Sequence, residues 1–215
     1  METNNLFIPS GFIVFISGVP GVGKTTISYE LLKRFDRFRI IEETDLIRET
    51  LRGYNEFLKS HFGDIGKSIF NKVQITDHTK LLTFDEAKEQ CTFMKSSLEQ
   101  IVARQQRKGI STIINGVHII PEILNGIAQN HNIIYINLYV TNKDAIYNRI
   151  VNRNPTSYML NDISLIFKTN IDLFKSTENF VKNGNKLFNN IDVTFLKIDD
   201  TINSVLECIR KLTLK

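Results

Sequence analysis

A glycine-rich run between two apolar segments has the residue types of a phosphate-binding loop. Residues 18–25 read Gly-Val-Pro-Gly-Val-Gly-Lys-Thr and match G-x-x-x-x-G-K-[ST] at every fixed position. Glycines let the backbone curl so that successive N–H groups point at one anion, and a helix that starts here adds its positive dipole end. The residues expected to hold the phosphates of ATP are Gly18, Gly21, Val22, Gly23, Lys24, Thr25 and Thr26. Among these, Lys24 should reach the β- and γ-phosphates, and the Thr25 hydroxyl should bind Mg²⁺.

A mixed acidic and basic block follows the second predicted strand. Residues 43–49 read Glu-Thr-Asp-Leu-Ile-Arg-Glu, and Thr44 is expected to cap the helix that they open. Asp45 would lie near the γ-phosphate, where it could accept the proton of an attacking hydroxyl or help to hold Mg²⁺. Arg48 and Arg52 lie one and two turns later, so we expect both to bind an anionic substrate. A capped surface helix with solvated charges is the alternative interpretation.

Two arginines precede a helix-breaking Asn-Pro pair. Arg149 and Arg153 are four residues apart on a predicted helix and therefore project from one face. In kinases of the nucleoside-monophosphate type, arginines of a mobile lid neutralise charge on the transferring phosphoryl group. We expect such a lid at about residues 149–160, with two solvated surface charges as the alternative.

The composition of the chain indicates which classes of ligand and location fit it. The 215 residues carry 27 Lys and Arg against 23 Asp and Glu, a formal net charge of +4 that is spread along the chain. This suits phosphate ligands but does not predict a clustered nucleic-acid face. The two cysteines have no metal-ligand spacing, and no apolar run is long enough to cross a bilayer, so we expect no membrane association and a cytoplasmic protein.

Other phosphate-loop classes fit less well. The run Thr-Asn-Lys-Asp at 141–144 places its Asp one residue too early for the guanine-reading N-K-x-D of GTPases. The predicted strand at 111–115 ends in Asn-Gly, without the carboxylate that motor ATPases usually place there. Small-molecule kinases remain the best match.

Short β-branched runs alternate with helical patterns, which predicts one α/β domain over residues 1–215. We expect a three-layer α/β/α phosphate-loop kinase fold with a mainly parallel, five-stranded sheet. The predicted strands are 12–17, 38–42, 111–115, 133–140 and 192–198. Predicted helices begin near 24 and 44 and span 85–108, 142–153, 161–182 and 201–212. Residues 53–83 show few clear periods, and we interpret them as a substrate-binding insertion.

Three blocks of the chain resemble the 2-phosphoglycerate kinase family: Gly18–Thr26, residues 44–48, and Gly-Val-His-Ile-Ile-Pro at 116–121. The resemblance implies transfer of the γ-phosphate of ATP to a hydroxyl of a small, anionic metabolite. It makes Asp45 and Arg48 substrate-side residues and places His118 in the acceptor pocket. Asn115 stands where the family usually has an acidic residue, which weakens a magnesium or base role at that position.

The sequence thus predicts an ATP- and Mg²⁺-dependent kinase of a small molecule, with Lys24, Asp45, Arg48, Arg149 and Arg153 as catalytic candidates. A kinase of a macromolecule, such as a polynucleotide end or a peptide side chain, is one alternative. An ATP-binding regulatory module without transfer activity is another. GTP as donor, the acceptor and the oligomeric state are left open.

Overall fold

Five parallel strands form the centre of the molecule. The computed structural model describes residues 7–70, 81–128 and 132–213. The strands are β1 (Ile13–Ser17), β2 (Phe38–Glu43), β3 (Ser111–Gly116), β4 (Ile133–Tyr139) and β5 (Phe188–Asp192). Their order in the sheet is β2-β3-β1-β4-β5, and every neighbouring pair is parallel. The predicted five-stranded sheet is confirmed.

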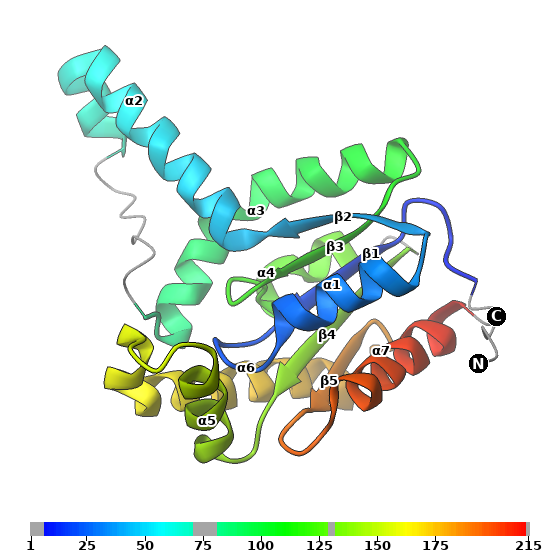
Figure 1. The fold of residues 1–215 in the computed structure, drawn as a ribbon. Coiled ribbons are helices and arrows are strands. Elements are labelled where there is room, and N and C mark those ends of the chain that lie inside the picture. Colours follow the sequence, from blue (N-terminus) through cyan, green and yellow to red (C-terminus); the bar gives the residue numbers. More distant parts are fainter. Residues whose placement is uncertain (1–6, 71–80, 129–131, 214–215) are drawn as a thin grey trace.

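Helices cover both faces of this sheet (Figure 1). Helices α1 (Lys24–Arg34) and α7 (Ile198–Thr213) pack together on one face. Helices α3 (Phe84–Arg107), α4 (Pro121–Ala128) and α6 (Ile163–Lys182) pack on the other, and α5 (Lys143–Arg153) lies at the end of the sheet. All five residues of β1 are buried, as expected for a central strand covered on both sides. The three-layer α/β/α prediction is therefore confirmed.

The carboxyl ends of the strands meet at one edge. Ser17 at the end of β1 lies beside Gly116 of β3 and Asn137 of β4, and Glu43 at the end of β2 lies beside Asn115. Open α/β sheets bind ligands outside this edge, so the loops that follow these strands define the candidate site.

The helices and strands differ from the predicted ones at three places. The last strand ends at Asp192 where the prediction began, because the polar run Phe-Asn-Asn-Ile-Asp conceals a strand while 193–197 form a loop. Helix α4 was missed because eight residues give too little periodicity, although Pro121 suits a first helical turn. Residues 53–70, for which no helix or strand was predicted, continue helix α2 (Thr44–Phe70), with a non-helical break at Gly63.

Helix α2 projects from the edge of the sheet beyond β2 (Figure 1). It begins at Thr44 itself, and the Thr44 hydroxyl forms a hydrogen bond with His118 at 3.0 Å. Residues 71–80 of the expected insertion lie outside the described residues. In the described part of the chain, no helix combines the length and apolar character that a bilayer crossing requires.

Candidate active site

The glycine-rich loop joins β1 to α1 in the conformation that its sequence requires. Gly21 and Gly23 have φ values of 87° and 96°, in the left-handed region that favours glycine. At Gly18 a β-carbon would lie 2.6 Å from the Leu138 carbonyl oxygen. Helix α1 begins at Lys24, so its free N–H groups point into the loop, and Gly23 caps it without any side chain in the way.

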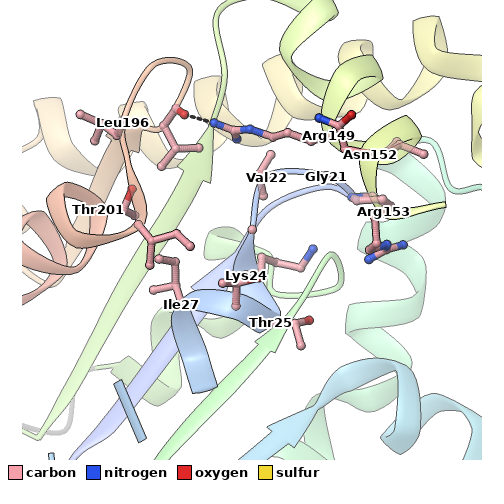
Figure 2. Close-up of a pocket in the computed structure, with 16 residues that line it drawn as sticks. Gly21, Val22, Lys24, Thr25, Ile27, Arg149, Asn152, Arg153, Leu196 and Thr201 are labelled. Atoms are coloured by element: carbon pink, nitrogen blue, oxygen red, sulfur yellow. Dashed lines mark hydrogen bonds between the residues drawn. The ribbon is translucent and has the colours of Figure 1, made fainter. Parts of the chain in front are cut away.

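Lys24 lies half-buried in this loop (Figure 2) and donates a hydrogen bond from Nζ to the Val19 carbonyl oxygen at 3.0 Å. Burial lowers the pKa of Lys24 to about 8, and the positive charge of Arg153 acts in the same direction. The carboxylates of Asp45 and Glu43 act to raise it. Of the groups that sequence analysis assigned to phosphate transfer, Asp45 and Arg153 thus act on the Lys24 ammonium group, together with Glu43.

A cavity of about 470 Å³ opens above the loop. One wall is the loop and the first turn of α1, a second is α5, and a third is the β5–α7 connection (Figure 2). The lining residues beyond the loop include Arg149, Asn152, Arg153, Val193, Leu196 and Thr201. The volume lies in the range of small-molecule sites in proteins.

The two arginines of α5 lie differently in this cavity. Arg149 extends toward the β5–α7 connection, where Nη2 donates hydrogen bonds to the carbonyl oxygens of Val193 and Thr194. Burial lowers the pKa of Arg149, and the charge of Asp192 opposes this. Arg153 is exposed and points away from that connection (Figure 2). Both predicted arginines thus line the cavity, but Arg153 alone contributes to the charge around Lys24.

A second cavity, of about 180 Å³, lies on the other side of the loop. Asp45 and Arg48 line it together with apolar side chains, and Pro20 lines both cavities. The remaining lining residues are Val19, Leu81, Leu82, Val117, Tyr158, Met159, Ile166 and Thr169. The segment predicted as a lid borders both cavities, because Arg149 and Arg153 line the first and Tyr158 and Met159 the second.

Arg48 is the buried cation of the second cavity, with 3% of its surface exposed. Its guanidinium lies 3.4 Å from Asp45 Oδ1 and 3.1 Å from Glu49 Oε1. Burial acts to raise the pKa of Glu49, but hydrogen bonds and charges from Arg52 and Arg48 outweigh it and lower the pKa. The Arg52 guanidinium lies 2.6 Å from Glu49 Oε2, and Arg52 does not line the second cavity. Of the three residues on α2 that were predicted to bind substrate, Asp45 and Arg48 therefore line this cavity.

His118 is fully buried behind Arg48 and Asp45. Nδ1 lies 3.0 Å from Thr44 Oγ1 and 3.9 Å from Asp45 Oδ1, and Nε2 lies 3.4 Å from Arg48 Nη1. Burial lowers the pKa of His118 to about 4; Asp45 opposes this, while Arg48 and Lys24 add to it. Sequence analysis expected His118 in the acceptor pocket, but its ring has no exposed surface and does not line the second cavity.

The residues at the loop fit a magnesium ion bound mainly by phosphate oxygens. The Thr25 side chain is exposed at the first cavity, and the Asp45 side chain is 61% exposed at the second. Across the described residues there is no cluster of three His, Cys, Asp or Glu side chains that could hold a metal ion by themselves. Asn115 donates a hydrogen bond to Ser28, so its side chain serves packing.

Sequence analysis missed Glu43 and the apolar walls of both cavities. Glu43 ends β2 and acts on Lys24, and its position at the end of a predicted strand was the available signal. Val193 and Leu196 were assigned to a strand, so their position in the lining of the first cavity was not predicted. Nothing in the local sequence marks Tyr158 or Met159, which reach the second cavity through the packing of the segment that follows α5.

The chain is similar in sequence to curated 2-phosphoglycerate kinases. It is 25% identical over 214 residues to that of Methanothermobacter thermautotrophicus, covering 94% of this chain and 67% of the relative. With that of Methanococcus maripaludis it shares 26% over 209 residues, or 92% of this chain and 64% of the relative. The chain thus spans about two thirds of the length of these relatives. No protein-family model matches it.

The fold is that of the phosphate-loop kinases. Shikimate kinase from Acinetobacter baumannii aligns with a TM-score of 0.52 at 16% identity, covering 98% of this chain and 97% of that one. A gluconokinase from Sinorhizobium meliloti aligns with a TM-score of 0.56 at 11% identity, covering 96% and 95%. These two alignments run through nearly the whole of each chain, so the described architecture is shared from end to end.

Proposed function

We propose that this chain is a kinase that transfers the γ-phosphate of ATP to a hydroxyl group of a small, anionic metabolite of the 2-phosphoglycerate type. The observation that carries the proposal is the pair of cavities that meet at Pro20 of the glycine-rich loop. One is large enough for a nucleotide, and the other holds a carboxylate and a buried guanidinium. A donor and an acceptor bound in these cavities would face each other across the loop, which is the positioning that phosphoryl transfer requires.

Each polar group then has a place in the reaction. Lys24 and Arg153 neutralise the charge that develops on the transferred phosphoryl group. Asp45, whose side chain is exposed to the second cavity, accepts the proton of the acceptor hydroxyl. Arg48 binds an anionic group of the acceptor, and Thr25 with Asp45 would hold Mg²⁺, which supplies further charge neutralisation.

The size of the second cavity and the names of the relatives support a small acceptor. About 180 Å³ accommodates a metabolite of a few carbon atoms and excludes a nucleotide-sized acceptor in the described state. The relatives are named for 2-phosphoglycerate, a small anionic hydroxy compound. An acid of this kind presents both the hydroxyl that Asp45 would deprotonate and the charge that Arg48 would bind.

Transfer of label from γ-labelled ATP with Mg²⁺ tests the proposal. The acceptor panel holds 2-phosphoglycerate, 3-phosphoglycerate, shikimate, gluconate, nucleosides, short RNAs and peptides. We expect label in one small hydroxy acid, and loss of this label in Lys24→Ala and Asp45→Asn. Arg37→Ala is the matched control, because Arg37 is exposed and lines neither cavity.

The outcomes separate the alternatives. Label in RNA or peptide alone would replace the small acceptor by a macromolecule. Tight ATP binding without label in any acceptor would contradict the kinase and favour a nucleotide-binding regulatory module. Label that survives in Lys24→Ala would show that the transfer does not use this loop.

A further inference from the structure

The buried imidazole of His118 connects the β3–α4 turn to helix α2. His118 follows β3, and its ring contacts two residues in the first turns of α2. Thr44 lies 3.0 Å from Nδ1, and Arg48 lies 3.4 Å from Nε2. Through these contacts the β3–α4 turn is tied to the helix that carries both polar residues of the second cavity.

The partners decide which ring nitrogen carries the proton. A guanidinium group has N–H donors and no acceptor, so contact with Arg48 requires a lone pair on Nε2. The proton of the neutral ring then lies on Nδ1, where it is donated to the Thr44 hydroxyl oxygen. Thr44 can accept it because a hydroxyl group both donates and accepts.

The charges around the ring keep it in this form. Arg48 and Lys24 disfavour an imidazolium, Asp45 favours one, and burial disfavours it most, so the pKa of His118 is lowered to about 4. A protonated ring would present N–H to N–H at Arg48 and would push the guanidinium away. The two contacts thus make Nε2 the acceptor for Arg48.

The other contacts of Arg48 are carboxylates on its own helix, and both are more exposed than its guanidinium. Glu49 holds one side of the guanidinium and is itself bound by Arg52, and Asp45 holds another side at 3.4 Å. Without a partner on the buried side, the guanidinium could follow Glu49 and Arg52 along the exposed face of α2.

We propose that His118 is a positioning residue, whose Nε2 holds the Arg48 guanidinium toward the second cavity and whose proton on Nδ1 is fixed by Thr44. His118 itself does not touch the acceptor. This role rests on the proposed function, since Arg48 is taken to bind the acceptor. It replaces the direct contact with substrate that the sequence suggested for His118.

Two amide substitutions separate the two ring nitrogens. In His118→Gln the longer side chain can still present an acceptor near the position of Nε2. In His118→Asn the shorter side chain reaches Thr44 but not Arg48. With 2-phosphoglycerate as the probe acceptor, we expect His118→Asn to raise the acceptor KM about 10-fold or more, as for the loss of a hydrogen bond to a charged group. His118→Gln should stay within about 3-fold of the unchanged protein, and the KM for ATP should change in neither variant.

His61→Asn is the matched control, because His61 is exposed on the projecting part of α2 and lines neither cavity. Thermal unfolding of all variants shows whether each one is folded at the assay temperature. Equal acceptor KM values for His118→Gln and His118→Asn would overturn the positioning role, and so would an equal rise in the KM for ATP.

Nitrogen-15 NMR of labelled histidine tests the same contact without any transfer reaction. The signal that is missing from His118→Asn belongs to His118. We expect a neutral ring with the proton on Nδ1 at pH ~7, as the contacts with Thr44 and Arg48 require.

A proton on Nε2 would contradict the proposal. If the unchanged protein transfers no label to any small acceptor while His118 shows the expected tautomer, the proposed function fails and the contact with Arg48 stands. If transfer occurs but the tautomer is the other one, the kinase stands and the positioning role fails.

Discussion

A β-carbon at Gly116 would lie 1.7 Å from the hydroxyl oxygen of Thr44, so the end of β3 passes against the first residue of α2 at a distance that glycine alone permits. This approach places the Thr44 hydroxyl beside His118 and brings α2 over the second cavity. The Gly-Val-His block is thus explained by packing between two neighbouring strand ends, β2 and β3.

Replacement of Gly116 by alanine should destabilise the protein. Thr44 lies on buried backbone and cannot move aside freely, so we expect Gly116→Ala to lower the free energy of unfolding by about 1–3 kcal/mol. Urea unfolding measures this. Gly126→Ala is the control, because a β-carbon there meets nothing within 4 Å, and its effect should stay below about 1 kcal/mol. Equal effects of the two substitutions would refute the close contact.

Binding of ATP should take up protons at alkaline pH. Lys24 has a pKa of about 8 in the empty loop, so it is charged below pH 8 and increasingly neutral above it. Phosphate oxygens favour the charged form and raise this pKa in the complex. ATP affinity should therefore fall as pH rises above about 8, and titration calorimetry at pH ~8.5 in buffers of different ionisation enthalpy should detect proton uptake. Lys24→Arg stays charged and should show no uptake; uptake that persists in this variant would assign the proton to another group.

The two arginines of α5 should differ in their kinetic effects. Arg149 holds the β5–α7 connection through two carbonyl oxygens, so Arg149→Ala should raise the KM for ATP about 10-fold with a smaller change in kcat. Arg153 lies near Lys24 and holds no such contact, so Arg153→Ala should lower kcat by about 10-fold or more. Steady-state kinetics in both substrates measure this, with Arg37→Ala as control. The division of roles fails if the two variants show the same pattern.

Glu49 should add a small, pH-dependent contribution to stability. Its pKa is lowered in the folded protein, so this contribution is present above the ordinary value of about 4.5 and is lost as pH falls through the lowered pKa. Because solvent reaches the carboxylate, we expect Glu49→Gln to cost about 1 kcal/mol or less at pH 7 and nothing at strongly acidic pH. Urea unfolding at several pH values measures the difference. A cost of Glu49→Gln that does not change between pH 7 and strongly acidic pH would contradict the assignment.

The phosphate loop and the strands around it could be predicted because their information is local. Gly21 and Gly23 occupy left-handed backbone that other residues resist, and the short apolar run at 12–16, followed by a glycine-rich turn, favours a strand buried on both faces. Such patterns are set by neighbours within a few positions along the chain. The sequence did not predict β5 or α4 correctly, because β5 is rich in polar residues and α4 is short, so neither has a clear local pattern.

The sequence by itself determined the glycine-rich loop with Gly18, Gly21, Gly23, Lys24 and Thr25, and the parallel sheet that presents it. Only the tertiary structure decided that Arg149 binds the β5–α7 connection while Arg153 stays near Lys24, although the two are one helical turn apart. It likewise decided that His118 is buried behind Arg48 instead of facing the second cavity. The conformation of a loop depends on local backbone geometry, whereas the partner of a long side chain depends on which distant segment packs beside it.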